Sequence, residues 1–210
     1  MIDKSSRSNK PSYYFVKEDC LKIKVFEDFF SSFDSDNYIR QLQRNINWKK
    51  EEIMVWGKKI ITKREVAWYA DPGKTYSYSG AKFFPNEWTK TLLEIKNKID
   101  DFSPVIFNSV LLNKYSDGKT GMGWHSDDEK ELGTNPVIGS VSFGAERDFL
   151  FKHKKNKDIN NLKIHLKNGS LLIMMGETQH YWLHSLPVRK KIKDKRINLT
   201  FRKIIFWADW

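Results

Sequence analysis

Cysteine and long apolar runs are what this sequence has least of. Cys20 is the one cysteine in 210 residues, which excludes a disulfide within the chain and a thiolate metal cluster. No apolar run approaches the roughly 18 to 20 residues that a membrane helix needs, and residues 1–10 carry no apolar segment typical of a secretory signal. We therefore expect a soluble intracellular protein without a membrane partner, with the choice between nucleus and cytoplasm open. Nothing in the sequence requires more than a monomer.

Positive charge and aromatic side chains are abundant instead. The 37 Lys and Arg residues exceed the 26 Asp and Glu residues and give a net charge of +11, while 8 Trp, 8 Tyr and 14 Phe residues supply large side chains for a core. The length fits a disordered basic tail over residues 1–12 and a single domain over residues 13–210. The cationic surplus favours a polyanionic partner such as nucleic acid, although a Lys-rich proteome in general would produce the same balance.

Two segments of the first half have the apolar spacing of helices. The spacing within residues 29–48 and 85–100 predicts one helix in each, and Ser35 or Asp36 is the expected start of the first. The residues expected to face the core are Phe30, Phe33, Ile39 and Leu42 in the first helix and Trp88, Leu92, Leu93 and Ile95 in the second.

Short strands are expected over most of the rest of the chain. Apolar residues alternate in short segments, and turn-forming pairs such as Asn168-Gly169 and Gly176-Glu177 separate them. A run of strands behind two helices predicts an α+β fold with an antiparallel sandwich or jelly roll as its core. The expected strands are residues 21–25, 108–115, 137–143, 147–153, 161–166, 170–175, 181–185 and 196–201.

The triplet His125-Ser126-Asp127 is the first candidate for chemistry. On an extended segment, residues i and i+2 project to the same face, so His125 and Asp127 can bind one metal ion together. His184 on a later strand is the candidate third ligand, and His180 on the same strand face is the alternative. Two histidines and one carboxylate suit Fe(II) and leave positions open for a co-substrate and O2. Such a triplet also occurs by accident, so a second feature is needed.

The expected strand nearest the C-terminus supplies that second feature. Its alternation places two arginines and two smaller polar residues on one face. Burying two arginines in a small domain is costly unless an anion pairs with them, and a dicarboxylate such as 2-oxoglutarate would satisfy both. An exposed strand with one wet, basic face is the alternative. The two arginines are Arg196 and Arg202, and they share this face with Asn198 and Thr200; Asn113 and Tyr115, again two residues apart, could add neutral hydrogen bonds to the dicarboxylate.

Taken together, these segments resemble the signature of the AlkB-type dioxygenases. The matching motifs are Asn113-x-Tyr115, His125-x-Asp127, His184 and Arg196-x-Asn-Leu-Thr-Phe-Arg202, and the resemblance runs from about residue 48 to residue 204. It implies a double-stranded β-helix (jelly roll) with N-terminal helices, a nucleotide-recognition region at about residues 48–84 and a catalytic jelly roll at about residues 105–205. It also implies catalytic iron ligands at His125, Asp127 and His184, with Arg196 at the distal carboxylate of 2-oxoglutarate and Arg202 nearer the iron.

Three segments resemble the substrate-binding parts of the eukaryotic-type, duplex-preferring DNA repair branch of this family. Residues 54–58 are similar to a hydrophobic finger that fills the gap left by an extruded base, and residues 75–80 are similar to a lid over that base. Asp128 would contact the base. Core packing of Trp56 and of Tyr78 is the alternative. The implied substrate contacts are Val55, Trp56, Gly57, Lys58, Tyr76, Ser77, Tyr78 and Asp128.

Other charged residues near these segments are expected to face solvent or phosphate. Glu129 and Glu131 are expected to lie in a solvated acidic loop. Lys63, Arg64 and the basic run at residues 189–191 can hold the phosphates of a nucleic acid.

The implied activity is oxidative demethylation of N-alkylated bases, such as 1-methyladenine and 3-methylcytosine, in DNA. This direct-reversal repair uses Fe(II) as cofactor and O2 and 2-oxoglutarate as co-substrates, and it releases succinate, CO2 and formaldehyde. The expected partner is duplex DNA with a flipped alkylated base. The alternatives are the same chemistry on RNA or a protein side chain, a catalytically silent nucleic-acid binding module, and an unrelated jelly-roll metalloprotein.

Overall fold

The computed structural model describes the backbone of residues 4–5, 11–55, 58–72, 76–78, 81–83 and 85–205. Within these ranges, side chains are described except for residues 4–5, 51–55, 58–60, 76–78 and 81–83. None of the helices in this part of the chain is long and apolar enough to cross a membrane.

The elements follow one another as strands with three α-helices and one short 3-10 helix between them. They are β1 (Lys4–Ser5), β2 (Tyr13–Glu18), β3 (Leu21–Phe26), α1 (Ser32–Asn45), β4 (Lys49–Val55), β5 (Lys58–Ala70), β6 (Tyr76–Tyr78), β7 (Ala81–Phe83), α2 (Lys90–Asp100), β8 (Ser109–Tyr115), β9 (Met122–His125), η1 (Lys130–Leu132), β10 (Ile138–Gly144), β11 (Arg147–His153), β12 (Leu162–Leu166), β13 (Ser170–Met175), α3 (Thr178–Tyr181), β14 (Trp182–Leu186) and β15 (Arg196–Arg202).

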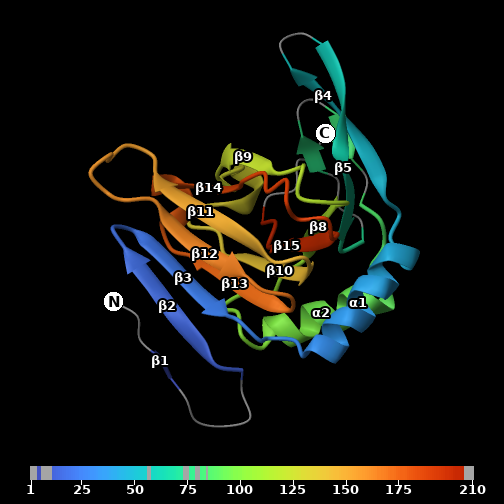
Figure 1. Cartoon of the computed structure of the whole chain (residues 1–210), viewed down its shortest axis with the longest axis horizontal. Coiled ribbons are helices and arrows are strands. Elements are labelled where there is room, and N and C mark those ends of the chain that lie inside the picture. Colours follow the sequence, from blue (N-terminus) through green and yellow to red (C-terminus); the bar gives the residue numbers. More distant parts are fainter. Residues whose placement is uncertain are drawn as a thin grey trace.

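Two antiparallel sheets form the body of the molecule (Figure 1). The larger has the strand order β1-β2-β3-β13-β10-β15-β8-β5-β4, the smaller has the order β12-β11-β14-β9, and β6 pairs separately with β7. From β8 onwards the chain passes repeatedly between the sheets, with β8, β10, β13 and β15 in the larger and β9, β11, β12 and β14 in the smaller. This exchange is the double-stranded β-helix, and it confirms the predicted jelly roll with N-terminal helices.

Apolar side chains fill a layer on each face of the larger sheet. In β13, Leu171 and Ile173 belong to the cluster that also contains the buried residues of α1 and α2, whereas Leu172 and Met174 belong to the cluster between the sheets. Successive residues of a strand point to opposite faces, which explains the division. Because the helices cover the outer face, polar residues on the inner face of the larger sheet are enclosed by the smaller sheet.

Helix α1 begins earlier than the sequence predicts. Ser31 caps it by accepting a hydrogen bond from the main-chain N–H of Asp34, at 3.1 Å, so the helix starts before Ser35 or Asp36. Phe33 therefore lies in the first turn and is 80% exposed, and the prediction that it faces the core is wrong.

Helix α2 begins later than predicted, after the Thr89 cap, whose hydroxyl accepts a hydrogen bond from the main-chain N–H of Leu92. Residues 85–89 are thus not helical. Leu93 is 40% exposed, so its assignment to the core is also wrong. The predicted core positions that are buried are Phe30, Leu42, Leu92 and Ile95.

Several of the N-terminal strands were not predicted from the sequence. β2, β4 and β5 are among them, and the β4–β5 hairpin projects beyond the rest of the molecule (Figure 1). Only the part of β5 from Glu65 to Ala70 also pairs with β8. Within the expected N-terminal tail, Lys4 and Ser5 pair with β2, while the remainder of residues 1–10 lies outside the described residues.

Candidate active site

Three potential metal ligands converge at the edge of the smaller sheet. β9 ends at His125, and β14 places His184 directly opposite it in the ladder. Asp127 follows β9, and one ligand atom from each of the three residues lies within 4.8 Å of the others. In the part of the chain that the structure describes, no other His, Cys, Asp and Glu side chains form such a group. The structure therefore brings together the three residues predicted to bind iron.

Hydrogen bonds to other residues orient the side chains of His125 and Asp127. Nδ1 of His125 lies 2.8 Å from the carbonyl oxygen of Gly123, so it donates there and leaves the lone pair of Nε2 toward the cluster. The Nε2 atoms of His125 and His184 are 3.1 Å apart. Arg202 donates from Nη2 to Oδ1 of Asp127, whereas Oδ2 of Asp127 lies 3.9 Å from Nε2 of His184. Two imidazole nitrogens and one carboxylate oxygen thus face a common point.

Burial and nearby charge set the protonation of the ligands. Burial lowers the pKa of His184 to about 4, so its imidazole is neutral at pH 7. Burial alone would raise the pKa of Asp127, but the positive charge of Arg202, with smaller effects of His184 and His125, outweighs it and holds that pKa below its usual value. A neutral imidazole and an ionised carboxylate are the forms that bind a divalent cation.

His180, the alternative third ligand, lies outside this cluster. It belongs to the short helix α3 and not to β14, which begins at Trp182. Its side chain is exposed, and Nε2 accepts a hydrogen bond of 3.4 Å from the main-chain N–H of Asn135. The expectation that His180 and His184 share a strand face is therefore wrong.

β8 and β15 place the predicted dicarboxylate-binding residues side by side. In the ladder, Arg196 lies opposite Tyr115, and Asn198 lies opposite Asn113. Directly opposite residues share a face of the sheet, and this is the inner face because Ile197, Leu199 and Phe201 belong to the cluster under the helices. Thr200 and Arg202 continue the row along β15, and the bond from Arg202 to Asp127 connects this row to the metal cluster.

Unsatisfied polar atoms on this face fit an anionic ligand. Arg196 is 3% exposed and donates from Nη2 to the hydroxyl of Ser142, at 2.9 Å, while its Nε is buried without a hydrogen-bond partner. Oδ1 of Asn113 is also buried without a partner, but it is an acceptor and so does not itself point to an anion. Burial lowers the pKa of Arg196 to about 10, which leaves it cationic at neutral pH. A buried cation with an unused donor fits a carboxylate, which accepts from a guanidinium group.

Asn198 differs from Asn113 opposite it, because the nitrogen and the oxygen of its amide both have hydrogen-bond partners within the protein. Its Nδ2 donates to the hydroxyl of Ser140 and to the carbonyl of Val141, and its Oδ1 accepts from the hydroxyl of Thr200. Its contacts fix the orientation of Thr200 on the inner face.

Arg147 is a second buried cation in this region, and it was not predicted from the sequence. It is 1% exposed and donates from Nη2 to the carbonyl oxygens of Thr120 and Pro187, at 3.1 and 2.7 Å, so it ties together two loops. Its charge adds to the effect of burial in lowering the pKa of Arg196. No spacing pattern could have identified it, because both partners are main-chain atoms far along the sequence.

Gln179 and Lys154 hold Asp127 and Asp128 in place beside the metal cluster, and they were not predicted from the sequence either. Gln179 is fully buried, and its Oε1 accepts a hydrogen bond of 2.9 Å from the main-chain N–H of Asp127. Lys154 donates from Nζ to Oδ2 of Asp128, at 3.1 Å, and to the carbonyl oxygen of Gln179, at 2.8 Å. These partners are brought together only by the fold, so no local motif marks them.

The structure describes the predicted finger and lid only in part. Val55 and Lys58 pair with each other at the far end of the β4–β5 hairpin, and Trp56 and Gly57 lie outside the described residues. β6 (Tyr76–Tyr78) pairs with β7 to form the separate two-stranded sheet. For these strand residues the backbone alone is described, so the predicted side-chain contacts stay predictions.

The acidic residues after Asp127 are not all solvated. Asp128 is exposed, and its Oδ2 accepts a hydrogen bond of 2.9 Å from the hydroxyl of Ser126. Glu129, in contrast, is half-buried, its Oε2 is buried without a hydrogen-bond partner, and burial raises its pKa. The expectation of a solvated loop is therefore wrong for Glu129, because the chain turns into η1 immediately afterwards and keeps this carboxyl near Arg202.

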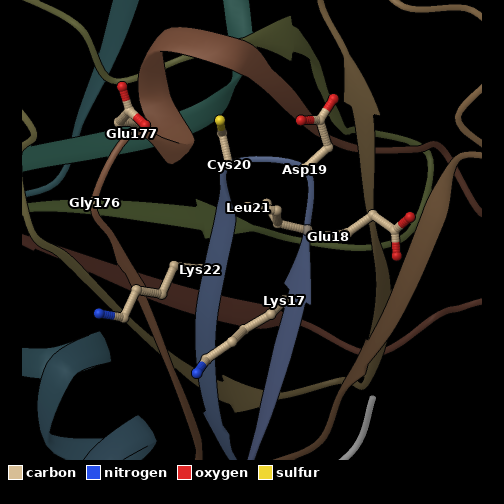
Figure 2. Close-up of a pocket in the computed structure, with 8 residues that line it drawn as sticks. All are labelled: Lys17, Glu18, Asp19, Cys20, Leu21, Lys22, Gly176 and Glu177. Carbon is tan, nitrogen blue, oxygen red and sulfur yellow. The ribbon is translucent and has the colours of Figure 1, made fainter.

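A hollow of about 510 Å³ lies elsewhere, at the turn between β2 and β3 (Figure 2). Its lining includes Lys17, Asp19, Lys22 and Glu177, together with the thiol-bearing Cys20. None of its lining residues belongs to the predicted site, and side chains of both charge signs surround it. We therefore place the candidate active site at the metal cluster and not in this hollow.

Comparisons with known proteins agree with this geometry. A family model for the 2OG-Fe(II) oxygenase superfamily matches residues 22–202. The chain is similar to the DNA oxidative demethylase ALKBH2 of Mus musculus, with 37% identity over 185 residues that cover 84% of this chain and 77% of that protein. With the protein of the same name in Arabidopsis thaliana, it shares 35% identity over an alignment 233 positions long, gaps included, which covers 97% of this chain and 73% of the plant protein.

The chain is also similar to a relative with another name and to a solved structure of lower sequence identity. The alpha-ketoglutarate-dependent dioxygenase alkB homolog 3 of Mus musculus is 36% identical over 191 residues, which cover 87% of this chain and 66% of that protein. The solved structure described as "The structure of OsALKBH1" has a TM-score of 0.57 at 19% identity and covers 86% of this chain and 97% of that chain. At this identity the likeness concerns the fold.

Proposed function

Because the chain belongs to the 2OG-Fe(II) oxygenase superfamily, and within it to the AlkB type, we propose that it is a DNA oxidative demethylase. It removes N-linked methyl groups from bases such as 1-methyladenine and 3-methylcytosine, and releases succinate, CO2 and formaldehyde. The assignment of DNA as the substrate is based on the relatives that are named DNA oxidative demethylase. The observation that carries the chemistry is the bond from Arg202 to Asp127, because it joins the dicarboxylate-binding row to the metal cluster.

The three converging ligands hold Fe(II) in this proposal. Nε2 of His125, Nε2 of His184 and Oδ2 of Asp127 are the binding atoms, since Nδ1 of His125 and Oδ1 of Asp127 already have protein partners. When bound, the iron activates O2 at the expense of 2-oxoglutarate so that an N-methyl group is oxidised. Gln179 and Arg202 keep the carboxylate of Asp127 in place by binding its main-chain N–H and its second oxygen.

The inner face of β8 and β15 binds 2-oxoglutarate. The unused Nε of Arg196 marks the end at which the distal carboxylate binds, and Tyr115 lies opposite Arg196 there. Asn113, opposite Asn198, offers its amide nitrogen as a donor to the co-substrate. Arg202 and Thr200 lie toward the metal cluster, and Asn198 acts through its bond to Thr200. Two arginines at the two ends of the row match the two carboxylates of the co-substrate.

Asp128 contacts the target base. Its exposed carboxylate lies beside the metal ligand Asp127, and its negative charge complements a base that methylation has made cationic. The proposal extends to duplex DNA with a flipped base, bound by a monomer. The projecting β4–β5 hairpin, at whose end the predicted finger residues lie in the sequence, and the net charge of +11 both support it. The same chemistry on RNA is the alternative.

A demethylation assay tests the proposal directly. The purified protein is loaded anaerobically with Fe(II) and then given 2-oxoglutarate, air and a duplex oligonucleotide with one 1-methyladenine. Mass spectrometry follows the loss of one methyl group, and succinate is measured in parallel. We expect demethylation by the wild type, none by Asp127→Ala, and wild-type behaviour by Asp158→Ala, which removes an exposed carboxylate distant in sequence from the cluster. Circular dichroism establishes that both variants fold.

Different outcomes separate the chemistry from the substrate. Faster reaction on the duplex than on the matching single strand supports duplex repair, and faster reaction on the matching RNA selects the alternative. Succinate formation without demethylation would keep the dioxygenase and reject methylated DNA as substrate. No succinate under any of these conditions would overturn the assignment as an enzyme.

A further inference from the structure

Asp128 is anchored through only one of its two carboxylate oxygens. Oδ2 accepts hydrogen bonds from the hydroxyl of Ser126, at 2.9 Å, and from Nζ of Lys154, at 3.1 Å. No described residue donates to Oδ1 of Asp128. Because the side chain is 50% exposed, the unanchored oxygen is available to a ligand while the anchored one restricts rotation about the side-chain bonds.

Lys154 is itself held in place by the protein. Its main-chain N–H donates to the carbonyl oxygen of Tyr181, at 2.7 Å, and its Nζ donates both to Asp128 and to the carbonyl oxygen of Gln179, at 2.8 Å. The side chain of Gln179 in turn accepts the main-chain N–H of Asp127. One ammonium group therefore connects the exposed carboxylate to the residue that positions a metal ligand.

We propose that Lys154 is a positioning residue for the substrate, which sets the orientation of Asp128 toward the methylated base. The inference rests on the proposed function, because it assumes that Asp128 contacts that base. With Oδ2 fixed by Lys154 and Ser126, Oδ1 is presented to the base at a defined distance from the metal cluster. A carboxylate without these contacts would lose rotamer entropy when the base binds, and Asp128 avoids that loss.

Binding of a DNA phosphate is the competing role for a lysine on this loop. Nζ of Lys154 already donates to two oxygens, and its side chain is only 24% exposed, so a phosphate would have to replace one of these partners. Lys157, three residues further along the same loop, is exposed and forms no ion pair or hydrogen bond within the described part of the chain. It is therefore a matched control, since its removal changes the charge of the loop equally.

The test compares Lys154→Met, Lys154→Arg, Asp128→Asn, the double variant Lys154→Met/Asp128→Asn and Lys157→Met. Steady-state demethylation of a 1-methyladenine duplex gives kcat and KM, binding of the unmethylated duplex measures the phosphate contribution, and the KM for 2-oxoglutarate reports on the rest of the site. Wild-type demethylation in the same assay must be present first, so a failure of the proposed function is distinguished from a failure of this inference.

We expect Lys154→Met to raise the KM for the methylated duplex about threefold to tenfold, the range for a partly exposed charged hydrogen bond, with kcat changed by less than about twofold. Lys154→Arg restores most of the affinity because a guanidinium group can also reach both acceptors. In the Asp128→Asn background, removal of Lys154 has little further effect, since both substitutions break the same interaction. Binding of unmethylated duplex and the KM for 2-oxoglutarate stay at the values of Lys157→Met.

Three results would overturn the inference. The first is an unchanged KM in Lys154→Met. The second is an effect of Lys154→Met that is equally large in the presence and absence of Asp128. The third is an equal loss of affinity for methylated and unmethylated duplex, which would assign Lys154 to a phosphate. If Lys154→Met does not fold, Lys154→Gln, alone and combined with Asp128→Asn, supplies the same comparison.

Discussion

At the scale of single residues, the candidate active site consists of polar groups that the fold buries with part of their hydrogen-bonding capacity unused. Arg196 keeps a buried Nε and Asn113 keeps a buried Oδ1 without partners, although a buried unsatisfied group costs about 1 to 3 kcal/mol. A carboxylate that accepts from Nε of Arg196 recovers the cost of that donor on binding, whereas Oδ1 of Asn113 is an acceptor that a carboxylate cannot satisfy. The strength of 2-oxoglutarate binding therefore depends on a few individual side chains.

Arg196 is the residue on which this argument can be tested most simply. Arg196→Met keeps the length of the side chain and removes the cation, so we expect the KM for 2-oxoglutarate to rise at least about tenfold, as for loss of a charge-assisted pair. The iron ligands are untouched, and the affinity for Fe(II) should not change. Succinate release at varied 2-oxoglutarate concentration measures the effect. Arg40→Met, which removes an exposed arginine of α1, should behave as the wild type, and a normal KM in Arg196→Met would contradict the assignment.

His184 makes the stability of the metal-free protein depend on pH. Its pKa is about 4 in the folded protein and about 6.5 in an unfolded chain, so between these values the unfolded chain binds more protons. The free energy of unfolding therefore falls as the pH is lowered from 6.5 toward 4, and at pH 5 the loss is about 2 kcal/mol. Urea unfolding in EDTA at pH 7.5 and pH 5 measures it. We expect His184→Gln to remove this part of the dependence and His180→Gln to keep it; equal pH dependence in all three proteins would reject the mechanism.

The candidate metal and 2-oxoglutarate residues could be predicted from the sequence because strand alternation is a local property. It placed His125 with Asp127 and the polar residues of β15 on one face, and the structure shows both arrangements. Arg147, Gln179 and Lys154 could not be found in this way. Their partners are mostly main-chain atoms or side chains that meet them only after both sheets have formed.

At the scale of secondary structure elements, the sequence predicted the strands of the jelly roll better than the elements around them. β8 and β10 to β15 lie within about one residue of the expected ranges, because their buried faces give a clear alternation and turns bound them. β5 has no such clear signal, since its first half pairs only with β4 and carries charged residues. The start of α1 was misplaced because Ser31 and Asp34 form a cap that competes with the equally plausible Ser35.

Three contacts fix the position of the loop that contains the basic run at residues 189–191, although the loop has no regular secondary structure. The main-chain N–H of Arg189 donates to the carbonyl of Gly118, the N–H of Gly118 donates to the carbonyl of Ile192, and Arg147 holds Pro187. A side chain on Gly118 would collide with the main chain of Arg189, because a Cβ there would lie 2.0 Å from its carbonyl oxygen. The loop is thus fixed next to β14, which carries His184, and not free to swing away from the site.

At the scale of the whole molecule, the net charge of +11 should make DNA binding strongly dependent on salt. We expect the affinity for unmethylated duplex to fall about a hundredfold or more between about 50 and 200 mM salt, because each phosphate contact releases a counterion.

Lys190 and Lys191 are exposed on the tethered loop, so Lys190→Gln and Lys191→Gln should each reduce the slope of log K against log salt by about one. Lys90→Gln removes an equal charge at the start of α2. Because this helix packs on the outer face of the larger sheet, away from the candidate site, the variant should leave the slope unchanged. Fluorescence anisotropy with a labelled duplex gives the slopes. If Lys90→Gln lowers the slope as much as the loop variants do, the charge acts through the overall field of the molecule, and the phosphate contacts at residues 189–191 are rejected.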